Sequence, residues 1–292
     1  MSIIQIVKSI VGVIMLCTIG ATIYFVQKLV NAVDDDGEVI PRVHKKEELG
    51  LKIKLEQVKG GGSEPGEKAY QNAVQLLERG PIEMAEARLK YVVSNYPSAN
   101  SAVKARKILG KMNVDRLLDP SNKKGKVTVE VKSGDTFSRI LNKNQTTMDS
   151  LAHFSGLMRV DAQNLYPGDK LTVLPLNMRL VIDVNRKRLT LFDGENFIKD
   201  YSILKASYEG SGVLKTKISS IRGSKDGKNV SPHSVEYRAS NKTVFLTDKS
   251  IMLRSEEDKS GEDYALGCVL SQVDMEELPL LLCPGNEIEI RR

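Results

Sequence analysis

The sequence offers few residues that could act as nucleophile or base. Its cysteines are Cys17, Cys268 and Cys283, and its histidines are His44, His153 and His233. A cysteine attacks as the thiolate, and because a free thiol has a pKa of about 8–9 it needs a neighbouring base. Only His233 shares the C-terminal segment with Cys268 and Cys283. These two thiols could include a nucleophile, could form a disulfide, or could be small buried side chains.

Composition sets the broad class. The chain has 292 residues, of which 41% are hydrophobic and 27% charged, with a net charge of +6. This length predicts two to three compact units. Because the basic residues are scattered and interrupted by acidic runs, nucleic-acid binding is not expected. Weak attraction to an anionic wall or membrane fits better, and we expect no metal and no cofactor.

The N-terminal segment contains a candidate membrane anchor within residues 1–30. Ser9 to Val26 is a run of 18 uncharged positions between Lys8 and Lys28, which is about the length of helix that spans a bilayer. A cleaved signal peptide is the alternative, since small residues follow the run. We expect a single-pass anchor, the bulk of the chain outside the cytoplasm, and a flexible linker over residues 31–66.

Residues 67–118 show helical periodicity in three stretches. Gly80-Pro81 and Tyr96-Pro97 separate them, as expected at helix ends. The first two helices resemble a tetratricopeptide pair. One such repeat cannot form the concave groove of a long array, so a spacer or dimerisation unit is expected. Peptide binding is the alternative.

Residues 127–174 predict a strand, two helices and a second strand. Val127, Val129 and Val131 alternate as in a half-buried strand. Asp135 is expected to cap a first helix that carries Phe137. A second helix is expected from Thr147, and a closing strand from Leu171 to Leu174.

The motifs at both ends of this segment resemble a LysM domain over its full length. They are Val129 to Phe137 and Asn164 to Leu171. The resemblance implies a shallow groove for the N-acetylglucosamine units of peptidoglycan or chitin, between two loops. Carried over, one side holds Gly134, Asp135, Thr136 and Phe137, and the other holds Leu157, Met158 and Arg159. Turn, cap and core roles would also explain the first four residue types.

Residues 178–292 predict a mostly β region. Alternation indicates antiparallel strands at 180–184, 189–191, 197–198, 213–221, 235–238, 243–246 and 287–290, and a short helix near 273–282. The opening from Leu180 to Gly194 and the ending from Gly267 to Ile290 resemble an L,D-transpeptidase domain. In that family a cysteine, here Cys268, attacks the carbonyl of a peptide stem.

The residues that the family places around its cysteine are replaced here. Met252 stands at the base position, and Leu266 and Leu270 replace polar residues beside the thiol. Arg254 is available in a shifted alignment, but a guanidinium stays protonated and takes no proton. His233 is the remaining candidate for a displaced base. Apolar surroundings raise the pKa of a thiol, so we expect an inactive site.

The expected fold class is α+β and multidomain: a transmembrane helix, a small helical unit, a βααβ LysM module and a mostly β L,D-transpeptidase-like domain. The expected function is membrane-anchored binding of peptidoglycan glycan strands, with stem peptides as possible further ligands. An active cysteine transpeptidase that forms cross-links through Cys268 is one alternative. A scaffold that recruits a partner through the helical unit is another.

Overall fold

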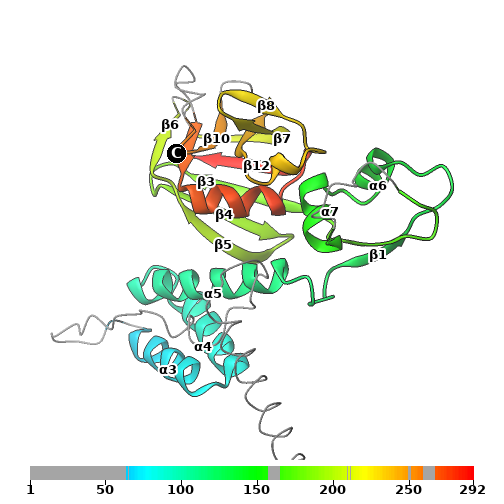
Figure 1. Ribbon diagram of the computed structural model, residues 1–292. Helices are drawn as coiled ribbons and strands as arrows, with labels where there is room; N and C mark the ends of the chain where they lie inside the picture. Colours follow the sequence, from blue (N-terminus) through cyan, green and yellow to red (C-terminus); the bar gives the residue numbers. More distant parts are fainter. Residues whose placement is uncertain are drawn as a thin grey trace, which may run out of the picture. The chain divides into compact units, whose positions relative to one another are not determined.

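The chain folds as a mixed helix-and-sheet protein. The computed structural model describes residues 64, 66–156, 165–208, 210, 212–248, 251–258 and 267–292 (Figure 1). None of the helices in these ranges is long and apolar enough to cross a membrane. The expected anchor at residues 9–26 lies outside the described residues, as does almost all of the expected linker. The described residues belong to one compact unit.

Three helices open the described chain. They are α3 (Glu67–Arg79), α4 (Ile82–Asn95) and α5 (Asn100–Leu118). Helix α3 ends at Gly80, whose φ of 104° is a left-handed cap conformation that favours glycine. Apolar side chains of all three helices pack into one cluster that includes Ala73, Leu89 and Leu109. The predicted breaks at Gly80-Pro81 and Tyr96-Pro97 are confirmed.

Residues 127–173 form the predicted strand, two helices and strand. These elements are β1 (Val127–Glu130), α6 (Phe137–Lys143), α7 (Met148–Ser155) and β2 (Lys170–Val173). Strands β1 and β2 pair antiparallel. A separate small core, with Ile140, Leu151 and Val173 at its centre, lies between the strands and the helices.

The sequence predicted the N-cap of α7 correctly but not the N-cap of α6. Thr147 caps α7 as expected, since its side chain accepts a hydrogen bond from the Ser150 N–H. Helix α6 is capped by Thr136, which accepts from the Arg139 N–H, and not by Asp135. Asp135 instead accepts from the Lys132 N–H inside the preceding turn, at 2.8 Å. Both residue types are good caps, so their order alone did not distinguish them.

A ten-stranded sheet forms the rest of the described chain, which we call the β region (residues 178–292). Its strands are β3 (Met178–Asp183), β4 (Arg188–Asp193), β5 (Asn196–Ser202), β6 (Lys205–Ser207), β7 (Val213–Lys225), β8 (Lys228–Val230), β9 (Asn241–Leu246), β10 (Met252–Ser255), β11 (Gly267–Leu270) and β12 (Glu287–Arg291). The order is β5-β4-β3-β12-β7-β9-β10-β11-β6, with β8 paired to β7.

The sheet is mixed, which corrects the expectation of antiparallel strands throughout. β12 pairs parallel with β3, and β10 pairs parallel with β11. Alternation within a strand reports its buried face and says nothing about the direction of its neighbour. The long strand β7 contains a register shift at Ser219, whose hydroxyl donates to the Phe245 carbonyl at 3.0 Å. Such a bulge bends a strand and lets it belong to both halves of a curled sheet.

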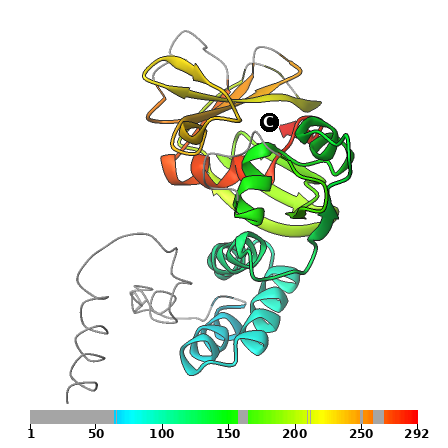
Figure 2. The ribbon, with the colours of Figure 1, turned by 45° about the vertical axis from the view of Figure 1, so that its right-hand side comes forward.

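The curled sheet packs around α8 (Gln272–Glu277) and the short helix η3 (Leu278–Leu281), shown in orange to red in Figure 2. Helix α8 contacts β9 and β10 on one side. On the other side Tyr201 and Lys199 of β5 both donate to Glu277, at 2.8 and 2.6 Å. The predicted helix near 273–282 is therefore confirmed, and it connects the edge strand β5 with β9 and β10.

Residues 235–238 are not a strand, although alternation predicted one. Val235–Tyr237 forms a short 3-10 helix, η1, capped by the Ser234 side chain, which accepts from the Glu236 N–H. Pro232 lies just before this turn. A serine that caps a turn overrides a three-residue alternation, because the cap satisfies a backbone donor locally.

Helix α5 packs on strand β5, a contact that the sequence did not predict. Gly110 allows it, since a Cβ at that position would lie 3.2 Å from the Lys199 Cα. Arg106 forms a bidentate pair with Asp200, with donor to acceptor distances of 2.6 and 2.8 Å. The Arg106 guanidinium also lies 4.2 Å from the centroid of the Phe197 ring. The helical unit is thus packed against the β region.

The Arg106–Asp200 pair should stabilise this attachment. Both side chains are about one-fifth exposed or less, and bidentate pairs with limited solvent contact are stronger than surface pairs. Arg106→Met should lower the free energy of unfolding by about 2 kcal/mol. A double-mutant cycle with Asp200→Asn, followed by urea unfolding, measures the coupling. Lys111→Met on the same helix is the control. A coupling energy near zero would contradict the assignment.

Candidate functional site

The loop between β1 and α6 is held by its own polar groups. Gly134 has a φ of 81° and nothing within 4 Å of its Cβ position, so glycine is needed there for its backbone conformation and not for space. Its carbonyl accepts from Arg139 Nη1 at 3.0 Å. Gly134 and Thr136 are exposed, and Asp135 is half-buried. The loop therefore presents backbone groups on a fixed turn.

A second turn lies beside this loop. The Val131 N–H donates to the Asp169 carbonyl and the Gly168 N–H donates to the Val131 carbonyl, both at 2.8 Å. Tyr166 in the same turn has 63% of its surface exposed. Leu157, Met158 and Arg159, expected to form the opposite side of the glycan groove, lie outside the described residues.

Phe137 belongs partly to the core of this segment. Its side chain is half-buried and packs against the cluster of Val131, Ile140 and Leu151. The ring also faces His233 of the β region, with 6.4 Å between the ring centroids. The four residues Gly134 to Phe137 thus lie together, with Phe137 turned toward the protein.

Cys268 lies in the interior of the β region. Its strand β11 runs between β10 and β6, and 4% of the residue is exposed. Gly267 before it makes a close approach, since a Cβ there would lie 2.3 Å from the Met252 carbonyl oxygen. Among the described residues no hydrogen bond reaches the Cys268 sulfur. Burial raises the pKa of this thiol to about 12, so it is protonated at neutral pH.

The strand register shows which side chains surround the thiol. Leu253 of β10 pairs with Cys268, whereas Met252 pairs with Gly267 and Arg254 with Val269. Because side chains alternate along a strand, Met252 and Arg254 belong to the face opposite Cys268. Leu270 shares the face of Cys268 and is fully buried. Leu253 and Leu270 therefore form the apolar surroundings of the Cys268 thiol. Met252, which the sequence placed there, lies on the other face. Leu266 lies outside the described residues.

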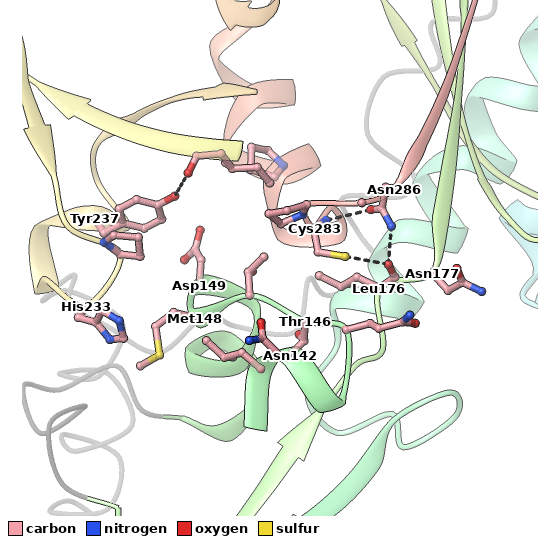
Figure 3. A pocket seen from close by; sticks show the side chains of 18 residues that line it. Asn142, Thr146, Met148, Asp149, Leu176, Asn177, His233, Tyr237, Cys283 and Asn286 are labelled. Atoms are coloured by element: carbon pink, nitrogen blue, oxygen red, sulfur yellow. Dashed lines mark hydrogen bonds between the residues drawn. The ribbon is translucent and has the colours of Figure 1, made fainter. Parts of the chain in front are cut away.

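His233 is exposed and lines a cavity of about 440 Å³ between the α6–α7 turn and the β region (Figure 3). Cys283, and not Cys268, lines the same cavity. Cys283 donates from its sulfur to the Leu176 carbonyl at 3.2 Å, and burial raises its pKa. Cys268 and Cys283 are both free thiols. The structure thus places His233 with the LysM segment and does not bring it together with Cys268.

His153 is a packed, hydrogen-bonded side chain that does not line the cavity. Its Nε2 lies 2.7 Å from the Leu118 carbonyl, and burial lowers its pKa. His44 is outside the described residues. The cavity itself was not foreseen, because its lining comes from segments far apart in the sequence that no motif connects.

Several solved structures are similar to parts of this chain. One is a fused Zn-dependent amidase/peptidase/peptidoglycan-binding domain-containing protein from Clostridium acetobutylicum, 9% identical over 39% of this chain and 51% of its own, with a TM-score of 0.28. Another is an L,D-transpeptidase from Mycobacterium smegmatis, 9% identical over 43% of this chain and 64% of its own, with a TM-score of 0.28.

L,D-transpeptidase 3 from Mycobacterium tuberculosis is 11% identical over 44% of this chain and 77% of its own, with a TM-score of 0.27. The chain spans less than two thirds of the length of the first two of these proteins. No curated protein matches the chain in sequence.

The segment with strands β1 and β2 matches a known family. Residues 129–174 match the LysM domain family, over the same stretch that folds as strand, helix, helix and strand around its own core. Residues 129–174 are therefore a LysM domain.

Proposed function

We propose that the chain is a peptidoglycan-binding protein that holds N-acetylglucosamine-containing glycan strands through its LysM domain. The observation that carries the proposal is the fixed β1–α6 loop, which exposes Gly134 and Thr136 beside the turn of Tyr166. Backbone N–H and C=O groups on such loops can bind the acetamido and hydroxyl groups of a sugar. A shallow groove buries little surface, so each unit binds weakly.

The β region, in this proposal, is not a transpeptidase. Its sequence motifs resemble that family, but the cysteine at the nucleophile position is buried among Leu253, Leu270 and other apolar side chains. A thiolate is required for acyl transfer, and the burial of Cys268 opposes its formation. The region then serves as a folded support for the LysM domain. The alternative, an active enzyme, needs a base that reaches Cys268.

The proposed location rests on the sequence alone. The uncharged run from Ser9 to Val26 would hold the chain in the cell membrane, with the LysM domain on the side of the wall. Anchoring would raise the local concentration of a weak glycan-binding site near its target.

Gly134→Val should weaken glycan binding. Valine at a φ of 81° is strained even though the space is open, so the loop must change its path. Gly125→Val is a matched control, because Gly125 has a φ of 77°, is also unobstructed and lies in the turn before β1. Co-sedimentation of the full chain with purified peptidoglycan should fall about tenfold or more for Gly134→Val only. Equal sedimentation of wild type and Gly134→Val would count against the proposal.

The buried thiol should make stability depend on pH in the alkaline range. In the unfolded chain Cys268 loses its proton near pH 9, whereas in the folded chain its pKa is about 12. The folded state therefore holds the proton more tightly, and the stability this provides is complete below pH 9 and is lost as the pH rises toward 12. Between pH 8 and 10.5, wild type should lose about 2 kcal/mol more unfolding free energy than Cys268→Ala.

Urea unfolding at the two pH values measures this difference. The tyrosines whose pKa is also raised contribute equally to the pH dependence of both proteins, so their contribution drops out of the difference. The free-energy cost of the cavity that alanine leaves does not depend on pH, so it drops out as well. Parallel pH profiles for the two proteins would mean that Cys268 is already ionised or solvated in the folded state.

A carbapenem should not acylate Cys268. The expected result is no covalent adduct by intact-protein mass spectrometry after an hour with excess carbapenem at pH 7.5, as for Cys268→Ala. Met252→His should not restore acylation, because position 252 belongs to the other face of β10. An adduct that forms within minutes on wild type and is absent from Cys268→Ala would establish the active-enzyme alternative, and His233→Ala would then test the displaced base.

A further inference from the structure

His153 lies where three segments of the chain meet. It belongs to α7 of the LysM domain, and its Nε2 lies 2.7 Å from the carbonyl oxygen of Leu118, the last residue of α5. On its other side, Nδ1 lies 3.3 Å from Nη2 of Arg238, which follows η1 in the β region. One imidazole of the LysM domain thus contacts both the helical unit and the β region.

The two partners determine the protonation state of the ring. A carbonyl oxygen only accepts hydrogen bonds, so the Nε2 of His153 must carry the hydrogen. A guanidinium only donates, so Nδ1 must be the unprotonated nitrogen. Both contacts therefore require a neutral imidazole with its hydrogen on Nε2. A proton added to Nδ1 would place two donors and two cations against each other.

The charged groups around the ring come from the same three segments. Asp149, one turn earlier on α7, pairs with Arg238 at 3.2 Å, and its side chain is only 10% exposed. Burial lowers the pKa of His153 most, and the positive charges of Arg238 and of Lys126, just before β1, lower it further. The Leu118 carbonyl and the Asp149 carboxylate oppose this shift without reversing it.

Residues 231–240, which we call the Arg238 turn, contact the LysM domain at two points. Arg238 meets His153 of α7. His233 faces the ring of Phe137, with 6.4 Å between the ring centroids. Because Phe137 directly follows the exposed glycan loop, the Arg238 turn lies beside that loop.

We infer that His153 is a pH switch at this junction: the neutral ring holds the Arg238 turn against the LysM domain, and protonation of the ring releases the turn. This regulation goes beyond the proposed glycan binding and does not depend on it. The hydrogen bonds of Leu176 with Gln145 and Asn286 contain no group that titrates near neutrality. The two regions therefore stay attached while the turn opens.

Acid should favour the released turn. A released imidazole has the ordinary pKa of about 6.5, whereas the pKa of the ring in contact with Arg238 is lower. The released state therefore binds the proton more tightly. The contact is complete above pH 6.5 and weakens as the pH falls through this value. By reciprocity, loss of Arg238 should raise the pH at which His153 takes up its proton.

Hydrogen–deuterium exchange of the full chain, read by mass spectrometry, measures the release. The reporter is the backbone of the Arg238 turn at pH 7.5 and 5.0, after correction for the intrinsic pH dependence of exchange. In wild type the protection of this segment should fall about fivefold or more at pH 5.0, while the protection of β4 stays the same. His153→Gln should stay protected at both pH values, because its amide can donate and accept but does not titrate. His233→Gln is the matched control and should keep the wild-type response.

The imidazole itself gives a second measurement. ¹⁵N-labelled histidine in the full chain reports by NMR which ring nitrogen carries the hydrogen, and His153→Gln assigns the signal. At pH 7.5 the hydrogen should be on Nε2, and Arg238→Met should move the titration midpoint of His153 to higher pH. A role in packing alone predicts no such dependence on the charge of Arg238.

Four results would each overturn the inference. They are a hydrogen on Nδ1 of His153 at pH 7.5, a midpoint that Arg238→Met leaves unchanged, an Arg238 turn that keeps its protection at pH 5.0 in wild type, and a loss of protection in acid that persists in His153→Gln or disappears in His233→Gln. Sedimentation with peptidoglycan is not among these measurements, so a failure of the glycan proposal would leave the switch standing.

Discussion

The backbone N–H and carbonyl of Leu176 join the LysM domain to the β region, and much of the structure depends on them. Its N–H bonds to the α6–α7 turn, and its carbonyl accepts from Asn286 and Cys283, just before β12. Leu176 is fully buried and belongs to the same apolar cluster as Phe154 of α7. A buried carbonyl that lost these donors would cost about 1–3 kcal/mol. The two regions therefore meet through a polar connection inside an apolar core, and the cavity lies above it.

Packing and reactivity oppose each other at Cys268. A nucleophilic thiol needs water or a cation nearby to stabilise its charge, whereas Cys268 shares the core with Leu253 and Leu270. The same burial that makes the cysteine a good core residue raises its pKa. Gly267 makes a close approach to the Met252 backbone, since a Cβ at position 267 would lie 2.3 Å from the Met252 carbonyl oxygen.

The sequence predicted local structure well and relations between distant segments poorly. The end of a helix at Gly80 and the order of elements in the LysM domain followed from helix-breaking residues and hydrophobic periodicity. Both are local properties of the sequence. The parallel pairs of β10 with β11 and β3 with β12 did not, because alternation is the same for either strand direction. Among the site residues, the grouping of Gly134 with Phe137 is sequence-local and was foreseen. The cavity lining, the role of Leu253 and the packing of α5 on β5 depend on tertiary contacts that no spacing reveals.

The geometry around Leu176 also bears on how a weak sugar contact is made. A freely swinging LysM domain would lose orientational entropy each time its loop met a glycan strand, and this cost would reduce an affinity that is already low. The bonds from Leu176 to Gln145, Asn286 and Cys283 restrict that motion. Rigid attachment thus fixes the orientation of the LysM domain relative to the β region.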